Sequence, residues 1–233
     1  MKMVTDDYQK LKQVDDVLGR IDNQCSLMVG GFGGVGSPPT LIEAILEKGV
    51  KDLTVICNDA GFPTIGTGKL ISAGRVSKLI ASHIGSNPIA GKMMSEGKLE
   101  VEFSPQGTLA ERIRAGGLGI GGILLDIGID NEIVYKGKSI IHVDSKPYLL
   151  ETPLTADVAI IYGKTADSYG NLIYDKSARN MNPLIAMAGH YTVAEVTDIV
   201  ELGTLDEEAI ITPGIFINSV VKSKGINWKW VWE

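Results

Sequence analysis

Short continuous apolar runs recur along the chain and alternate with segments whose apolar residues have helical spacing. Strands that are buried on both faces of a parallel sheet have such continuous apolar sequences. The regular alternation of the two patterns therefore predicts an α/β fold, with a mostly parallel central sheet and flanking helices. The predicted strands cover residues 26–29, 53–57, 78–82, 99–103, 156–161, 191–196 and 214–217.

The predicted helices cover residues 8–18, 40–46, 69–71, 92–94 and 108–115. In the last of these, Thr108 and Glu111 match a capping box, and the glycines that open the run 116–122 are expected to end the helix. The whole run 116–122 is rich in glycine, which predicts a turn where the backbone approaches another segment closely. A hairpin is predicted within residues 133–147, with a turn at 136–138 between strands at 133–135 and 139–143.

One stretch between a predicted strand and a predicted helix holds five glycines, at positions 30, 31, 33, 34 and 36. Glycine allows positive φ angles and a close approach of the backbone to a ligand. The helix that follows offers free N–H groups and the positive end of its dipole, and Pro39 suits its first turn. The stretch is either a cradle for an anionic ligand or a tight turn that binds nothing. It matches neither the dinucleotide-binding motif nor the phosphate-loop motif.

Composition narrows the classes of function. The chain has 233 residues, of which 44% are hydrophobic, so it can bury a sizeable core, and residues 1–233 are expected to form one domain. Its net charge is −6 without a basic stripe, which argues against nucleic acid as a partner. Cys25 and Cys57 lie in apolar runs, as small buried residues do in a reducing compartment. No apolar segment has the length of a signal peptide or membrane span, so we expect a cytoplasmic protein without membrane contact.

Only one polar residue stands out as a candidate for chemistry. His83, His142 and His190 lie in different elements without metal-ligand spacing, so no metal site is expected, and no nucleophile elbow is present. Gln106 lies in a Pro-Gln-Gly loop between a predicted strand and a predicted helix. Its amide either donates a hydrogen bond to an oxyanion or only caps the following turn. The loop 58–63 follows the second strand, at the sheet edge where open α/β sheets bind ligands.

Four segments, 30–38, 58–61, 104–117 and 177–183, together resemble family I CoA-transferases. Specifically, they are similar to the alpha (A) subunit of the acetate/butyrate–acetoacetate (3-oxoacid) type. The most specific run is Pro-Gln-Gly-Thr-Leu-Ala-Glu-Arg-Ile-Arg-Ala-Gly-Gly, within residues 104–117. The resemblance extends along nearly the whole chain and implies the open, CoA-transferase-like (NagB/RpiA-like) architecture.

The resemblance implies a transferase that moves CoA between a short-chain acyl-CoA, such as acetyl- or butyryl-CoA, and acetoacetate in short-chain fatty acid metabolism. In the family, a glutamate forms a covalent intermediate and the kinetics are ping-pong. That glutamate lies in a Ser-Glu-Asn-Gly motif of the beta subunit, which this chain lacks. The resemblance therefore implies activity only with a beta subunit, in an α2β2 heterotetramer. Coenzyme A is a substrate, and no further cofactor is implied.

By the same resemblance, Gln106 is the oxyanion donor. The residues implied to bind CoA or substrate are Gly30, Gly31, Phe32, Gly33, Gly34, Val35, Gly36, Asn58, Gly117 and Gly119. Asp59 lies in the same loop as Asn58, and we interpret it as a residue that lines the cleft rather than as a nucleophile.

Two features leave alternatives open. The family usually has a Thr-Pro-Thr-Gly stretch near the acyl pocket where this chain has residues 123–130, so the acyl chain length and the acceptor acid are not carried over. The tail with Trp228, Trp230 and Trp232 suits either a subunit contact or packing on its own chain. A non-catalytic module that senses acyl-CoA or sugar phosphate is the alternative function, although a sensor needs no oxyanion donor at Gln106.

Overall fold

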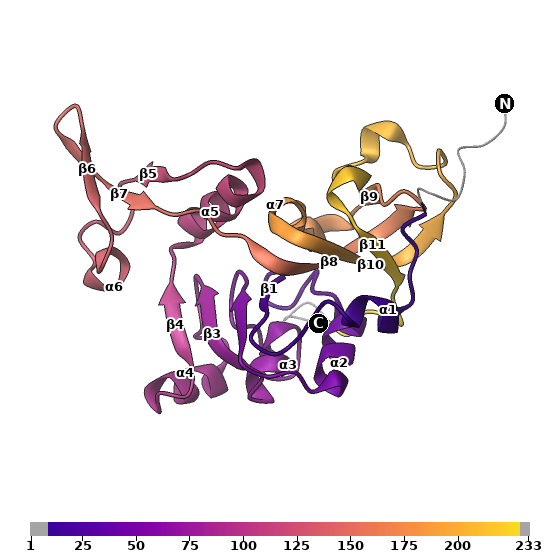
Figure 1. Cartoon of the computed structure of the whole chain (residues 1–233), viewed down its shortest axis with the longest axis horizontal. Helices are drawn as coiled ribbons and strands as arrows, with labels where there is room; N and C mark the ends of the chain where they lie inside the picture. The colour runs from indigo at the N-terminus through magenta and orange to yellow at the C-terminus, as the bar shows by residue number, and fades with distance from the viewer. Residues whose placement is uncertain (1–8, 229–233) are drawn as a thin grey trace.

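The protein is built around an eight-stranded sheet, and the computed structural model describes residues 9–228. The strand order is β11-β10-β8-β1-β2-β3-β4, and the short β9 pairs with β8 (Figure 1). All pairs are parallel except β8–β9, which confirms the predicted α/β fold with a mostly parallel sheet. The strands are β1 Ser26–Val29, β2 Leu53–Ile56, β3 Val76–Ala81, β4 Glu100–Phe103, β8 Ala156–Asp167, β9 Leu172–Ile173, β10 Gly189–Val200 and β11 Ser219–Lys222.

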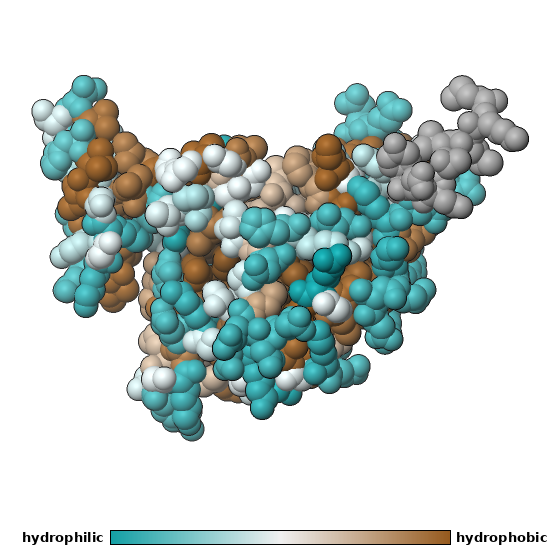
Figure 2. Space-filling model, in the orientation of Figure 1, coloured by the Kyte–Doolittle hydropathy of each residue, from teal (hydrophilic) through white to brown (hydrophobic). Residues whose placement is uncertain are grey.

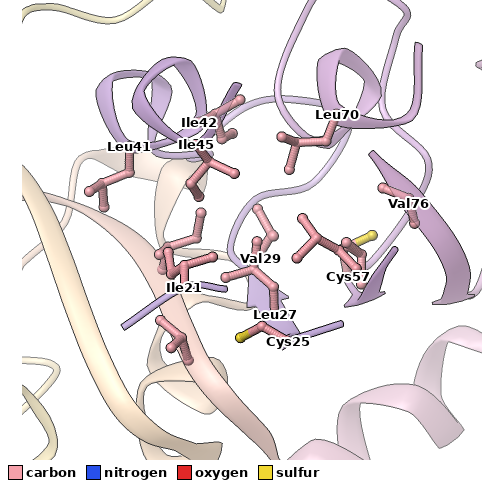
Figure 3. Close-up of a cluster of buried hydrophobic side chains, with 14 of the residues drawn as sticks. Ile21, Cys25, Leu27, Val29, Leu41, Ile42, Ile45, Cys57, Leu70 and Val76 are labelled. Atoms are coloured by element: carbon pink, nitrogen blue, oxygen red, sulfur yellow. The ribbon is translucent and has the colours of Figure 1, made fainter. Parts of the chain in front are cut away.

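Helices cover both faces of this sheet, as Figure 1 shows. Those on one face are α1 Val14–Leu18, α2 Pro39–Lys48, α3 Thr67–Ser72 and α4 Pro88–Ser95, and those on the other are α5 Gln106–Leu118 and α7 Asn182–Ala188. Side chains alternate between the faces along each strand, so one strand contributes to two cores. In β1, Leu27 and Val29 pack in the first core, beside Ile42 and Ile45 of α2 (Figure 3), whereas Met28 packs in the second.

A smaller antiparallel sheet with strand order β5-β7-β6 projects from the body (Figure 1). It consists of β5 Ile123–Leu125, β6 Ile140–Val143 and β7 Lys146–Glu151, with α6 Glu132–Tyr135 between β5 and β6. Several of its apolar side chains are exposed, and Figure 2 shows brown surface on this projection. The large exposed apolar residues here are Leu124, Ile127, Ile133, Tyr135, Ile140, Ile141 and Val143.

Of the hairpin predicted within residues 133–147, the first strand and the turn are wrong, whereas the second strand is present as β6. The side chain of Asn131 accepts a hydrogen bond from the Ile133 amide and caps α6, so the first predicted strand is helical. The hairpin instead joins β6 to β7, and its turn contains Asp144 and Ser145, both with positive φ. The apolar residues of 133–135 are compatible with a strand or a helix, and the cap at Asn131 favours the helix.

The boundaries predicted for α5 are also wrong at both ends. The helix begins at Gln106 after Pro105, so Thr108 lies inside its first turn and does not cap it. Gly116 and Gly117 belong to the helix, which ends at Leu118 with Gly119 in the left-handed conformation. The glycines at 116 and 117 are therefore not a turn, but the predicted close approach exists: a Cβ on Gly116 would lie 2.0 Å from the Leu154 carbonyl oxygen.

The structure differs from the sequence-based prediction at two further elements, the last predicted strand and the N-terminal helix. Residues 214–216 form a 3-10 turn, η4 Gly214–Phe216, since Pro213 and Gly214 favour a turn, and the last strand is β11. The N-terminal helix is shorter than the predicted 8–18: Leu11 forms an isolated bridge with Val220, and Tyr8 lies outside the described residues. Within residues 9–228, no helix has the length and apolar character needed to cross a bilayer.

We expect Gly116→Ala to lower the free energy of unfolding by about 1–3 kcal/mol, because the added methyl overpacks the contact with Leu154. Helix propensity alone would favour alanine by roughly 0.5–1 kcal/mol. The matched control is Gly107→Ala in the same helix, where a Cβ meets nothing within 4 Å. Urea unfolding of the two variants checks the prediction, and equal stability of both would contradict it.

Candidate active site

A pocket of about 1280 Å³ opens at one edge of the main sheet. The loops after β1, β2, β3 and β4 all leave this edge, because parallel strands end on the same side. Another part of the lining comes from the segment after β9, which includes η2 Lys176–Arg179, and from the end of η3 Glu207–Ala209. The lining residues are Phe32, Gly33, Val35, Asn58, Asp59, Phe62, Ser82, His83, Ser86, Gln106, Ile173, Tyr174, Lys176, Ser177, Arg179, Asn180, Ala209 and Ile211.

The glycine stretch forms a tight reversal at the pocket wall. Phe32 and Val35 exchange two backbone hydrogen bonds of 3.0 and 3.1 Å, and φ is 57° at Gly33 and 89° at Gly34 between them. Positive φ at both central positions is the geometry of a type I′ turn, which glycine adopts without strain. Of the residues implied by the resemblance, this turn brings Phe32, Gly33 and Val35 to the pocket. The remaining glycines at 30, 31, 34 and 36 lie behind that surface.

Two asparagines hold the turn from the other side. The Nδ2 of Asn180 donates to the Val35 carbonyl and the Nδ2 of Asn182 to the Gly36 carbonyl, both at 2.9 Å. Asn182 is fully buried, so it has no water to replace these partners. Both residues lie in the run 177–183 that contributed to the resemblance, but no local pattern in that run indicates this role.

The start of α2 is not free to bind a ligand. The backbone amides of Thr40 and Leu41 donate to the two carboxyl oxygens of Glu195, at 3.1 and 3.0 Å. Glu195 is fully buried, and burial raises its pKa, although the hydrogen bonds from Ser223, Leu41 and Thr40 act in the opposite direction. The anion predicted at this helix end is therefore a side chain of the same protein, and the predicted ligand contact with these amides is wrong.

Gln106 lies at the pocket as the first residue of α5, where its side chain is exposed. Its Nε2 atom donates to the Oδ1 atom of Asn58 at 3.4 Å, and Asn58 is 2% exposed. The fold thus brings together Gln106, Asn58 and the turn at Gly33, which are far apart in the sequence.

Gly117 and Gly119 lie elsewhere. A helix rises 1.5 Å per residue, so Gly117 is about 16 Å along α5 from Gln106. A Cβ on Gly117 would lie 2.6 Å from the Cβ of Met187, so this glycine allows α5 and α7 to pack closely. Neither residue lines this pocket, so their role in substrate binding stays a prediction. The stretch that departs from the family, 123–130, begins with β5 in the projecting sheet and also lies outside the lining.

Several lining residues were missed by the sequence analysis, and two of them are cationic. Lys176 and Arg179 are exposed in the segment that packs against the glycine turn, and His83, set aside for its lack of metal spacing, lies exposed at the β3 end. Lys176 and Asn180 adopt positive φ, at 49° and 20°, in a segment where neither is glycine. Such backbone strain is concentrated at functional sites, and cations here attract an anionic substrate.

Both thiols are free and buried, as predicted for Cys25 and Cys57. Burial, together with the charge of Asp157, raises the pKa of Cys25 to about 11, and burial raises the pKa of Cys57 further. At pH 8, only about one Cys25 side chain in a thousand is then the reactive thiolate. We expect the two cysteines of the native protein to react slowly with an aromatic disulfide reagent at this pH. In urea, both should react, and two equivalents of the aromatic thiolate should be released per chain. Fast labelling of the native protein would contradict this.

Trp228 packs on its own chain. Its ring meets Tyr162 edge-on with centroids 5.6 Å apart, and its Nε1 donates to the Ser37 carbonyl at 3.2 Å, next to the glycine turn. This favours the second of the two interpretations for Trp228. Trp230 and Trp232 lie outside the described residues.

The fold and the pocket define an open α/β protein that presents a side-chain amide where such sheets bind ligands. A family model described as Coenzyme A transferase matches residues 12–223. The chain is 62% identical over 226 residues to the "Probable coenzyme A transferase subunit alpha" of Bacillus subtilis (strain 168), with 97% of this chain and 99% of that protein covered. The chain belongs to the coenzyme A transferase family.

Further relatives carry the names of several related transferases. The "Acetate CoA-transferase subunit alpha" of Escherichia coli (strain K12) is 47% identical, with 92% of this chain and 97% of that protein covered. The "Acetoacetyl-CoA:acetate/butyrate CoA transferase alpha subunit" of Clostridium acetobutylicum is 48% identical, with 84% and 90% covered. Others at 41–48% identity are named for succinyl-CoA:3-ketoacid and 3-oxoadipate. The resemblance to CoA-transferase alpha subunits and the enzyme class are thus confirmed, whereas the names span several substrates.

Solved structures share the fold. The acyl-CoA transferase YdiF of Escherichia coli O157:H7 superposes with a TM-score of 0.83 at 23% identity, and 97% of this chain spans about half, 49%, of that chain. Glutaconate coenzyme A-transferase from Acidaminococcus fermentans gives 0.80 at 20% identity, with 91% and 75% covered. These likenesses confirm the open CoA-transferase-like architecture predicted from the sequence.

Proposed function

We propose that this chain is the alpha subunit of a heteromeric CoA-transferase that moves CoA between a short-chain acyl-CoA and acetoacetate. The proposal depends above all on Gln106, whose exposed side-chain amide lies in the pocket beside Asn58. An N–H donor at such an edge can stabilise the negative charge that develops on a carbonyl oxygen during acyl transfer. The glycine turn at Gly33 contributes to CoA binding, and no cofactor besides the substrate CoA takes part.

In the proposed reaction, a glutamate of a beta subunit attacks the thioester carbonyl of the acyl-CoA. The carbon–sulfur bond breaks, CoA leaves as a thiolate, and a mixed anhydride of the acid and the glutamate remains. The thiolate then attacks the glutamyl carbonyl, which releases the first acid and forms an enzyme–CoA thioester. Acetoacetate reverses these steps. The Gln106 amide donates to the oxyanion of the tetrahedral intermediates.

A nucleophile from a partner fits the surroundings of Asp59. Among the described residues that line the pocket, Asp59 is the one carboxylate. Its oxygens accept hydrogen bonds from the amides of Gly33 and Gly61 and from Nδ2 of Asn58, each at 2.8 Å. A carboxylate held by three donors is a poor nucleophile, because attack on a thioester would break these bonds. We therefore assign the attacking group to the beta subunit, in an α2β2 assembly.

The pocket lining supports an uncharged short acyl chain. Phe32, Phe62, Ile173 and Ile211 contribute apolar surface, which favours an alkyl chain over a second carboxylate. Lys176 and Arg179 suit the negative charges of the acid or of CoA.

The test is CoA transfer from butyryl-CoA or acetyl-CoA to acetoacetate, measured with this chain alone, with the beta subunit alone and with both. We expect activity only in the mixture. Succinate and 3-oxoadipate, offered as competing acids, are expected to react more slowly. Activity of this chain alone would contradict the division of the site, and preference for a dicarboxylic acid would contradict the proposed substrate.

A further inference from the structure

We infer that Asp59 is a positioning residue, whose carboxylate fixes the Asn58 amide and, through it, the Gln106 amide. The inference rests on the proposed role of Gln106 in CoA transfer and goes beyond it, because it gives Asp59 a role that acts through Asn58 and Gln106.

Asp59 is anchored from three directions. Its Oδ2 atom accepts from the Gly33 amide and from Nδ2 of Asn58, and its Oδ1 atom accepts from the Gly61 amide. The side chain is 8% exposed, so water competes little for these donors. The carboxylate therefore joins three parts of the site: the tip of the glycine turn, its own loop and the Asn58 amide.

The chemical nature of these groups fixes their order. A carboxylate only accepts hydrogen bonds, so the NH2 end of the Asn58 amide must face Asp59. The carbonyl end of Asn58 must then point the other way, where it accepts from Nε2 of Gln106. Gln106 consequently presents its NH2 group, and not its oxygen, on the side of Asn58. Because Nε2 carries two hydrogens, one bond to Asn58 leaves the second for an oxyanion.

The backbone gives this arrangement a rigid base. The Asn58 carbonyl accepts from the amide of Ser82 at 3.0 Å and from its hydroxyl at 2.7 Å, which ties the loop after β2 to the end of β3. Asn58 is 2% exposed. Its side chain can therefore exchange its two ends only by rotating the amide, and Asp59 opposes that rotation. Without the carboxylate, the Gln106 amide loses the partner that sets its orientation.

The experiment is a double-mutant cycle in the assembled enzyme, with kcat at saturating substrates as the readout. Asp59→Asn is expected to lower kcat at least about tenfold when Gln106 is present, because one end of the new amide is a donor and the side chain can no longer accept from Gly33, Gly61 and Asn58 together. In the Gln106→Ala background, the same change is expected to lower kcat by less than about threefold, since the group that Asp59 positions is gone.

The matched control is Asp167→Asn. Asp167 is 1% exposed and also accepts three N–H bonds, from the amides of Tyr169 and Asn171 and from the Asn171 side chain, but it lies outside the pocket lining. We expect a comparable fall in melting temperature with kcat unchanged. If Asp59→Asn does not assemble, Asp59→Ser replaces it in the cycle with the same expectations.

A loss of kcat in the Gln106→Ala background larger than about threefold overturns the inference, because Asp59 then acts independently of Gln106. A loss smaller than about tenfold with Gln106 present, or an equal loss in Asp167→Asn, also overturns it. The unmodified complex separates this result from the proposed function: absence of CoA transfer there contradicts the function itself, whereas full transfer with an additive cycle contradicts only the positioning role.

Discussion

Replacement of Gln106 by alanine is expected to raise the barrier of CoA transfer by roughly 2–4 kcal/mol, or about 30- to 1000-fold in kcat. This is the usual effect of removing one oxyanion donor from an acyl-transfer site. The affinity for acyl-CoA should change little, because the donor acts on a charge that is present only in the transition states. Steady-state kinetics of the complex with the beta subunit measure both quantities.

Folding should be unaffected by this change. The Gln106 side chain is exposed and makes one hydrogen bond, of 3.4 Å, so its loss leaves the core of α5 intact. Gln9→Ala, at an exposed glutamine that does not line the pocket, is the matched control and should retain full activity. Unchanged kcat in an assembled Gln106→Ala enzyme would remove Gln106 from the mechanism.

Gly33→Leu is expected to raise the KM for acyl-CoA at least about tenfold, because the new side chain occupies the pocket beside Asp59. The position has open space around it, with no atom within 4 Å of an added Cβ. The substitution also forces a non-glycine residue into φ near 57°, which costs about 1–2 kcal/mol of stability.

Gly74→Leu separates these two effects. Gly74 has φ of 65° and equally open surroundings, but it does not line the pocket. It should therefore show the same loss of stability and a normal KM. If both variants had the same KM, the glycine turn would not contribute to CoA binding.

The centre of the main sheet was predictable because strands such as β1 are apolar on both faces. Runs such as 26–29 and 53–57 are apolar at nearly every position, so both faces of each segment must be buried. Their length of four or five residues is that of a strand and is too short for a buried helix. The same holds for the position of Gln106, since a loop between a strand and a helix in a parallel sheet must lie at the sheet's carboxyl edge.

The elements that were wrongly predicted lie where local and tertiary preferences disagree. A pair of adjacent glycines usually ends a helix, but at positions 116 and 117 the glycines are needed so that Leu154 and Met187 can approach. The backbone amides at the start of α2 favour binding of an anion. That anion is the carboxylate of Glu195 in β10, and nothing within residues 30–48 indicates this partner. Both facts depend on segments that meet only after folding.

The sequence by itself determined the α/β class, the buried strands, the family and the candidate donor Gln106, because periodicity, composition and a specific motif are local properties. The tertiary structure decided which candidates share a site. It brought Asn58, Asp59 and Gly33 to Gln106 and added Lys176 and Arg179 to the same pocket, whose lining does not include Gly117 or Gly119. The reason is that strand order and loop packing set these distances, and neither is encoded in the spacing of residues along the chain.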